Sequence, residues 1–405
     1  MNFEYKDYEL SNAITDIAAG PFGSNLKVSC FTTTGFPIID GANLKEITVT
    51  DNITKFVPED KARSLHRSIA KRRDVVVTIS GNVGQVSYIP DNSQYAEYLC
   101  SQRQFRVTFD ESKIYVPYLV YYLHSVEGQS KILAFANQTG VPALSQPLKN
   151  FRKIKIDLPS LAEQKKIAAI LSALDEKIAI NREINENLER QAQSYFQELF
   201  VDNADPEWTT GTISDLGAVV GGSTPSKAKP EYYTESGIAW ITPKDLSNNK
   251  SKFVSHGEND ITELGLRNSS ASIMPEGTVL FSSRAPIGYI AIAAGEVTTN
   301  QGFKSVVPKP EIGTPFVYFF LKNTLPVIEG MASGSTFKEV SGSTMKNVPA
   351  VIPDAETLAK FSDFCAPIFA QQRILEEQNQ SLATLRDNLL PKLMSGEIDV
   401  SAVQL

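Results

Sequence analysis

The chain has 405 residues, enough for two or three domains, and its 42% hydrophobic content can supply ordinary buried cores. The net charge of −7 argues against a simple basic DNA-binding domain. No stretch approaches eighteen consecutive apolar residues, so a membrane-spanning helix is not expected. The three cysteines lie far apart and form no CxxC pair, which argues against a zinc site and fits a reduced, cytoplasmic setting.

The first predicted domain, residues 1–157, is an α+β lobe, called the first lobe below. Its residues 1–150 carry 15 basic and 15 acidic side chains, so the lobe is neutral although the chain is acidic. "VPYLVYYLHSV" (116–126) predicts a buried helix, and the alternating "KIKIDLP" (153–159) predicts a strand at the end of the lobe. "KARSLHRSIAKRR" (61–73) predicts a basic helix that contacts phosphates; a solvated basic helix without a ligand is an equal alternative.

Residues 158–205 predict one long helix, a central spacer. Ser160 and Glu163 form an S-x-x-E capping box at its start. A heptad stripe, typical of helices that pair with another helix, follows at Ile167, Leu174, Asn181, Leu188 and Tyr195. The polar Asn181 in this seam would fix the register of the pair at some cost in stability.

Residues 206–352 and 353–405 repeat this order as a second lobe and a second long helix. Residues 206–350 carry 12 basic and 13 acidic side chains, and "TPFVYFFLKNTL" (314–325) predicts a buried helix. The short run "VPAVIP" (348–353) predicts a strand at the end of this lobe. Asp354 can cap the last helix. Its stripe lies 194 positions after the first one, at Phe361, Ile368, Leu375, Leu382 and Leu389. Two helices with the same stripe can bury the stripes against each other.

The lobes also repeat internally. "GFPIIDGANL" (35–44) resembles "GIAWITPKDL" (237–246), and "VTISGNVGQV" (77–86) resembles "FSSRAPIGYI" (281–290). "SQRQF" and "NQGF" align when Phe105 is matched to Phe303. The chain is therefore predicted to consist of two tandem, pseudo-symmetric α+β domains separated by two long helices.

The motifs of several enzyme classes are missing. No glycine precedes a lysine, which excludes a P-loop, and there is no HExxH, GxSxG or acid-rich metal loop. No Pro-Pro pair is present, so the Asn/Asp-Pro-Pro-aromatic motif of DNA amino-methyltransferases is missing too. We predict no catalytic residue and no metal ligand in this chain.

The chain resembles the specificity subunits of type I restriction–modification systems along nearly its whole length. "LPSLAEQKKIAAILSALDEKI" and "LRDNLLPKLMSGEI" are similar to the central and C-terminal conserved regions of that family. "GPFGSNL" (20–26) and "GGSTPS" (221–226) resemble the openings of its two target-recognition domains. The resemblance implies that each lobe reads one half of a bipartite, asymmetric DNA site. It also implies that the two helices pair as an antiparallel coiled coil that sets the distance between the lobes.

The resemblance implies partners as well. Two modification subunits would dock on the chain and methylate adenine with S-adenosylmethionine, and restriction subunits would use ATP and magnesium. This chain would bind no cofactor itself and would act in the cytoplasm, in defence against phage.

We expect polar and basic side chains in the repeated loops and in the basic stretch to contact DNA, since Arg pairs with guanine and Asn or Gln with adenine. In the first lobe these are Ser24, Asn25, Arg63, Arg67, Arg72, Arg73, Ser80, Asn82 and Arg103. In the second lobe they are Ser226, Lys227, Lys244, Arg284, Gln301 and Thr336. Any single Ser or Asn among them can instead be a turn residue that satisfies the backbone.

Three alternative functions stay open. A freestanding regulator could read a split DNA site without enzymatic partners, although nearly neutral lobes disfavour tight binding by the chain alone. An enzyme with an unrecognised site is disfavoured by the missing motifs. A scaffold that uses only the long helices would leave two different polar lobes without a purpose.

Overall fold

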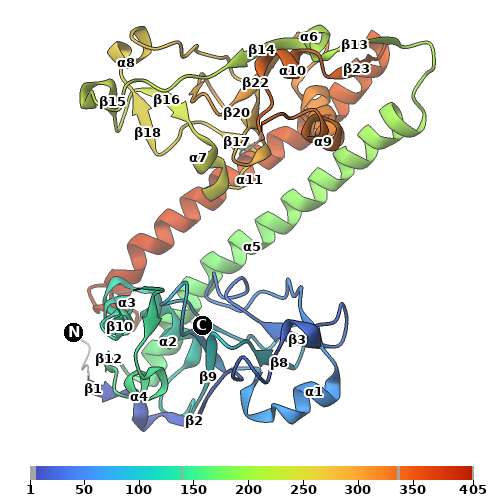
Figure 1. The fold of residues 1–405 in the computed structure, drawn as a ribbon. Helices are drawn as coiled ribbons and strands as arrows, with labels where there is room; N and C mark the ends of the chain where they lie inside the picture. The colour runs from blue at the N-terminus through green and yellow to red at the C-terminus, as the bar shows by residue number, and fades with distance from the viewer. Residues whose placement is uncertain (1–5, 138–139, 335–337, 404–405) are drawn as a thin grey trace. The chain divides into compact units, whose positions relative to one another are not determined.

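The computed structural model describes residues 6–137, 140–334 and 338–403, and it divides into two compact units (Figure 1). Unit 1 comprises Met1–Lys177 and Ser381–Leu405, and unit 2 comprises Ile178–Gln380. Each unit holds one α+β lobe and a segment of each of two long helices, α5 (Leu161–Gln197) and α11 (Ala355–Met394). Among the described residues, no helix is long and apolar enough to cross a membrane.

The lobe of unit 1 contains two four-stranded sheets. The first has the order β2 (Ile14–Ala19), β9 (Gln104–Phe109), β6 (Val75–Thr78), β7 (Val86–Tyr88). The second has the order β4 (Phe56–Val57), β3 (Phe36–Ile39), β8 (Glu97–Cys100), β5 (Ile69–Lys71), with β3 and β8 parallel. The helices are α1 (Glu59–Ser64), α2 (Val116–His124), α3 (Val126–Leu133) and α4 (Pro147–Arg152). The predicted buried helix is α2, which packs with the first sheet and the start of α5 in one core.

Unit 2 repeats this plan. One sheet has the order β14 (Gly217–Gly221), β22 (Lys304–Pro308), β19 (Val279–Ser283), β20 (Ile287–Ala293), β17 (Phe253–Val254). The other has the order β15 (Tyr233–Thr234), β18 (Asn259–Ile261), β16 (Ile238–Ile241), β21 (Thr298–Thr299), with β16 and β21 parallel. The helices are α6 (Ile213–Leu216), α7 (Pro243–Asn248), α8 (Glu263–Arg267), α9 (Thr314–Gly330) and α10 (Gly342–Lys346). The predicted buried helix is α9, and the α+β class is confirmed.

Each lobe is closed by a strand pair that joins its two ends. β1 (Lys6–Glu9) pairs with β12 (Lys155–Leu158), and β13 (Thr209–Thr212) pairs with β23 (Pro349–Ile352), both antiparallel. β12 and β23 are the alternating runs that the sequence predicts as strands. Each one leads directly into a long helix.

The strand pairing corrects one aligned pair of the sequence repeat. Gln104 opposes Thr78 in β6, and Phe303 opposes Ser282, which is the matching position in β19. Phe303 therefore corresponds to Gln104, and matching it to Phe105 is wrong. A shift of one residue moves a side chain to the other face of a sheet. Accordingly, Phe105 packs in the core with α2, whereas Phe303 packs between the two sheets of its lobe.

The structure also corrects the prediction of one basic helix at residues 61–73, because this stretch does not form a single helix. Only its start belongs to α1; a 3-10 turn, His66–Ser68, and the strand β5 follow. β5 pairs antiparallel with β8 and belongs to the second sheet of the lobe. The side chains of the stretch therefore lie at both ends of a strand and not along one helical face.

Both long helices begin with the predicted caps. The Ser160 amide donates to Glu163 Oε2 at 2.8 Å, and the Glu163 amide donates to Ser160 Oγ at 3.3 Å. Asp354 Oδ1 accepts from the Thr357 amide at 2.9 Å. These bonds satisfy amides at the helix starts that have no partner inside the helix.

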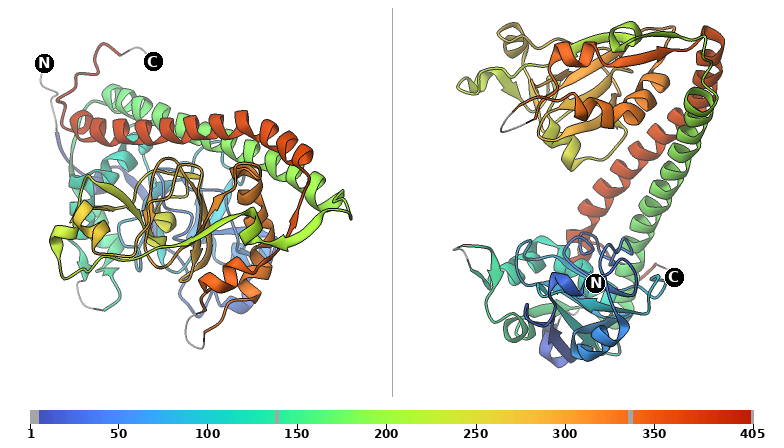
Figure 2. Two further views of the ribbon diagram at one scale, coloured as in Figure 1. Left: turned by 90° about the horizontal axis from the view of Figure 1, so that it is seen from above. Right: turned by 45° about the vertical axis from the view of Figure 1, so that its right-hand side comes forward.

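Within each unit the segments of α5 and α11 run antiparallel (Figure 2). In unit 2, Asn181 Nδ2 lies 3.0 Å from Asn379 Oδ1, and the Tyr195 ring lies 6.1 Å from that of Phe361. In unit 1, Asp175 Oδ1 accepts from the Arg386 guanidinium at 2.6 Å. As residue numbers rise along α5, those of its partners along α11 fall.

The side chains at the heptad positions differ in how deeply they are buried. Ile167, Asn181, Phe361, Ile368 and Leu375 are buried, while Leu174, Leu188, Leu382 and Leu389 are half-buried. Several of these side chains face a lobe as well as the other helix. Ile167 belongs to the core of the first lobe, and Phe361 and Ile368 belong to that of the second. The stripe thus joins each lobe to its helix segments.

Candidate nucleic-acid interface

Corresponding strand ends bring four loops together in each lobe, and we call this cluster the loop edge. In the first lobe the loop edge consists of residues 20–26, 40–43, 79–85 and 101–104. In the second lobe it consists of residues 222–226, 242–245, 283–286 and 300–303. The same backbone bond locks two of the loops in each case. The Ser101 amide donates to Ile39 O at 2.9 Å, and the Asn300 amide donates to Ile241 O at 3.0 Å.

One glycine in each target-recognition motif, Gly20 in "GPFGSNL" and Gly222 in "GGSTPS", is required by close backbone packing. A Cβ on Gly20 would lie 1.8 Å from Ser101 O, and one on Gly222 would lie 2.0 Å from Asn300 O. Any other residue would therefore push the opening loop away from its neighbour. This contact explains why the two lobes keep a glycine here while their other loop residues differ.

A glutamine holds the opening loop in each lobe. Gln102 Nε2 donates to Leu26 O at 3.0 Å, and Thr224 Oγ1 donates to Gln301 Oε1. Gln102 and Gln301 occupy equivalent positions in the register of the paired strands. Gln301, which the sequence suggests as a base reader, is exposed but accepts a hydrogen bond from its own lobe, and Gln102 is its counterpart that sequence reasoning missed.

The loop after the parallel strand is a capped turn in both lobes. The Asp40 amide donates to Asn43 Oδ1 at 3.1 Å, and the Thr242 amide donates to Asp245 Oδ2 at 2.7 Å. Lys244 is exposed in this turn, and its Nζ lies 2.6 Å from Glu258 Oε2. This hydrogen bond raises the pKa of Lys244, so the ammonium is charged at neutral pH.

Arginine lies at both loop edges. Arg103 is exposed in the first lobe, and its Nη1 lies 3.7 Å from where a Cβ on Gly81 would be, between the half-buried Ser80 and the exposed Asn82. Arg284 is half-buried in the second lobe, 3.4 Å from Glu339 Oε2. Glu339 is a site residue that sequence reasoning missed, because its partner lies 55 residues away in the chain.

The remaining residues predicted on the opening loops are accessible. Ser24, Asn25, Ser226 and Lys227 are all exposed. Thr336 lies outside the described residues. The loop edge therefore gathers most of the predicted polar residues of each lobe.

The arginines of the basic stretch are mostly engaged at the opposite end of their sheet. Arg63 binds Glu59 and Glu97, Arg73 forms a double hydrogen bond with Glu111, and Arg72 donates to Ser93 O at 3.1 Å. The hydrogen bonds of Arg63 to Glu97 and Glu59 raise its pKa. Only Arg67 lies at the end of β5 that faces the loop edge, and it is exposed. The structure does not bring the four arginines together.

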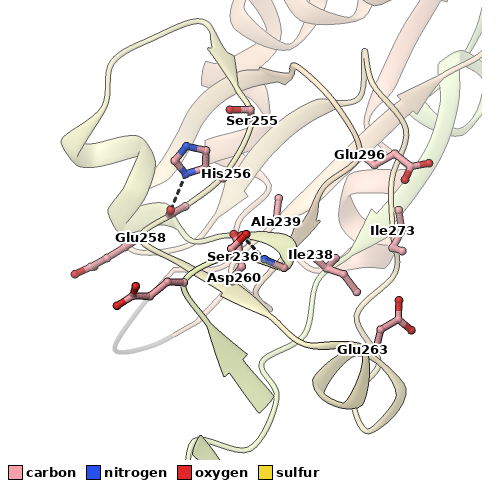
Figure 3. A pocket seen from close by; sticks show the side chains of 13 residues that line it. Ser236, Ile238, Ala239, Ser255, His256, Glu258, Asp260, Glu263, Ile273 and Glu296 are labelled. Atoms are coloured by element: carbon pink, nitrogen blue, oxygen red, sulfur yellow. Dashed lines mark hydrogen bonds between the residues drawn. The ribbon is translucent and has the colours of Figure 1, made fainter. Parts of the chain in front are cut away.

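A hollow of about 600 Å³ in the second lobe is strongly acidic. Glu258, Asp260, Glu263 and Glu296 line it, and Figure 3 shows their carboxylates around its rim. Phosphates of DNA would be repelled by these charges, except beside Glu258, whose carboxylate is paired with Lys244 of the loop edge. Among the residues that the structure describes, no cluster of three or more His, Cys, Asp or Glu side chains could hold a metal ion.

The chain is similar to known proteins in sequence and in fold. The family model described as the type I restriction modification DNA specificity domain matches residues 30–190 and 206–385. The MjaIX specificity subunit from Methanocaldococcus jannaschii is 39% identical over 194 residues, covering 46% of this chain and 45% of that protein. The matched segment thus spans less than half of that relative. The HindI specificity subunit from Haemophilus influenzae is 24% identical over 320 residues, covering 60% of this chain and 69% of that protein.

A solved structure shares the fold. The S subunit of a type I restriction-modification system from M. genitalium superposes with a TM-score of 0.60 at 17% identity. The match covers 97% of this chain and 96% of that one. At this identity the likeness establishes the fold alone, with two tandem lobes and two long helices.

Proposed function

Because the chain belongs to the type I restriction modification DNA specificity family, we propose that it is the DNA-recognition subunit of a restriction–modification complex. It would read a bipartite, asymmetric site, with one half-site contacted by the loop edge of each lobe. It would direct adenine methylation and restriction without contributing a catalytic residue.

One observation carries this proposal. The two loop edges have the same backbone arrangement but different side chains. Both loop edges keep the same glycine contact and the same capped turn. At matching positions, however, the first lobe has Asp40 where the second has Thr242, and Ser80 where the second has Arg284. Side chains that reach base edges specify sequence. Two different sets on one frame therefore suit two different half-sites.

The charge balance supports a need for partners. Phosphate contacts from Lys and Arg supply much of the affinity for DNA. Each lobe is nearly neutral, and several of its cations are bound to carboxylates of the same lobe. Two modification subunits would add the missing contacts and carry S-adenosylmethionine, and restriction subunits would carry ATP and magnesium. The complex would act in the cytoplasm.

A freestanding regulator of split sites is the second candidate, since the two lobes alone could select a sequence. It differs in one measurable respect, because it must bind DNA tightly without methyltransferase subunits. The nearly neutral lobes favour the first candidate.

Co-expression of the chain with the modification subunits of its own system tests the proposal. We expect a stable complex that methylates adenine at a bipartite motif, detected by methylome sequencing. The purified chain alone should show no methyltransferase, nuclease or ATPase activity. Specific, tight DNA binding by the chain alone, together with no complex formation, would favour the regulator.

A further inference from the structure

Identical hydrogen bonds fix which residues of the two loop edges correspond. The Ile79 amide donates to Arg103 O at 2.6 Å, and the Ser283 amide donates to Gly302 O at 2.7 Å. In the first lobe this bond lies one residue beyond the pair Thr78–Gln104, and in the second it lies one residue beyond the pair Ser282–Phe303. Arg103 in the first lobe therefore occupies the position of Gly302 in the second.

The next residue along each of these strands forms a second matching pair. Ser80 bridges to Ala143, and Arg284 bridges to Glu339, both antiparallel. The arginine of the second lobe thus stands where the first lobe has serine, and its carboxylate partner stands where the first lobe has alanine. Each loop edge has one arginine at these two neighbouring positions, but the arginine comes from a different strand in each lobe.

Although Arg103 comes from another segment, its side chain extends toward the position that corresponds to Arg284. Its guanidinium Nη1 lies 3.7 Å from where a Cβ on Gly81 would be, so it leans over the 80–81 turn. That turn is the counterpart of the segment that begins with Arg284. From this exchange, which rests on the proposed function, we infer that Arg103 and Arg284 are equivalent specificity-determining residues, each reading a guanine in its own half-site.

The surroundings of Arg103 favour a base over a phosphate. Phosphate contacts are typically made by several cations along a backbone. Arg103, by contrast, is the one Lys or Arg within the four loops of this loop edge, and uncharged residues such as Gln102 are its neighbours in the chain. A guanidinium matches the O6 and N7 acceptors of guanine with two parallel hydrogen bonds. The small Gly81 beside it leaves room for a base edge.

Arg284 can make the same contact despite its ion pair with Glu339. Both side chains of that pair are 37% exposed, so water already screens their attraction. Lys304 Nζ lies 3.7 Å from the other carboxylate oxygen of Glu339 and would keep that group partnered. If Arg284 left Glu339 to bind a guanine, no buried charge would therefore lose its last partner.

The test uses the full chain in complex with its modification subunits and compares four variants with the wild type. Arg103→Ala removes the guanidinium, and Arg103→Lys keeps the charge without the two-pronged geometry. Ser80→Arg with Arg103→Gly moves the arginine to the position that it has in the second lobe. Arg152→Ala, on α4, is the matched control. The motif is measured by methylome sequencing and by selection of bound DNA from a randomised pool, which needs no methylation.

We expect Arg103→Ala and Arg103→Lys to relax one guanine position of one half-site, with discrimination there falling about 5- to 150-fold. The other half-site should stay unchanged. The transposed double variant should restore the guanine preference, and Arg152→Ala should match the wild type. Thermal melting of each complex identifies a variant that has not folded, and the transposed variant then decides the question.

Other results would overturn the inference without touching the proposed function. An unchanged motif in Arg103→Ala would show that Arg103 reads no base. Uniformly weaker binding with the same motif, and a smaller dependence on salt, would identify a phosphate contact instead. A transposed variant that folds but does not recover the guanine would refute the equivalence. A wild-type complex that selects no bipartite motif would instead refute the proposed function itself.

Discussion

Lys252 Nζ lies 2.7 Å from Glu189 Oε2, and these two residues join the second lobe to its helix segments. The Lys252 side chain is only 6% exposed. Its ammonium also donates to Gln372 Oε1 on α11 at 2.8 Å and lies 3.6 Å from the centroid of the Phe369 ring. One buried cation in the lobe is therefore held by both helices of unit 2.

Replacing Glu189 should destabilise unit 2 strongly. Glu189 also binds Lys322, so Glu189→Gln leaves two cations without their carboxylate. Breaking a buried ion pair on one side costs about 3–5 kcal/mol. We expect a clearly lower melting temperature by calorimetry, whereas Glu186→Gln, on an exposed part of α5, should leave it unchanged. Equal melting of the two variants would contradict this role.

The same pair predicts a dependence on acid. Burial alone raises the pKa of Glu189, but the ammoniums of Lys252 and Lys322 outweigh it and lower the pKa to about 2, from an ordinary value of 4.5. A carboxyl with a lowered pKa in the folded state adds stability that is complete above its unfolded value and is lost as the pH falls through the folded one. Between about pH 4.5 and 2, the wild type should therefore lose more stability than Glu189→Gln. Parallel curves for both proteins would refute the assignment.

Asn181 should cost stability in exchange for register. It is fully buried, its Nδ2 donates to Asn379, and its Oδ1 has no hydrogen-bond partner within the described part of the chain. A buried unsatisfied polar group costs about 1–3 kcal/mol. The double variant Asn181→Leu with Asn379→Leu should melt higher than the wild type. A lower melting temperature would mean that the pair stabilises the seam.

The heptad stripe predicts a contrast between two leucines of α11. Leu375 is 4% exposed, and Leu385 is 47% exposed. Truncating a buried leucine to Ala costs about 2–5 kcal/mol, and a buried charge adds to this. Leu375→Asp should therefore lower the melting temperature and methylation by the complex, and Leu385→Asp should change the melting temperature little. Unchanged melting of Leu375→Asp would mean that the stripe is not a packing surface.

The lobes should act as separate readers. The domain limits predicted at 1–157, 158–205, 206–352 and 353–405 define what to exchange. Replacing residues 1–157 with the first lobe of another family member should change one half-site in the methylome and leave the other intact. The physical reason is that each loop edge is built entirely from one lobe. A change in both half-sites would show that the lobes are coupled.

The sequence alone determined the elements whose signals are local or periodic. The long helices follow from a seven-residue stripe and from caps such as Ser160 with Glu163, which act within one turn. The buried helices α2 and α9 and the strands before α5 and α11 follow from unbroken apolar or alternating runs. The duplication could be recognised from the sequence because both copies retain these helix and strand patterns. The family resemblance rests in part on the same two long helices.

The tertiary structure alone decided what depends on pairing between distant segments. Strand register cannot be derived from composition, so the match of Phe303 to Gln104 became visible only in the paired sheets. The basic stretch contains no Gly or Pro that would end a helix, yet part of it, β5, pairs with β8 as a strand. The partners Glu339 of Arg284 and Glu189 of Lys252 lie 55 and 63 residues away in the chain. Only folding brings such charges together. Their positions in the folded chain decide which side chains form ion pairs within the protein.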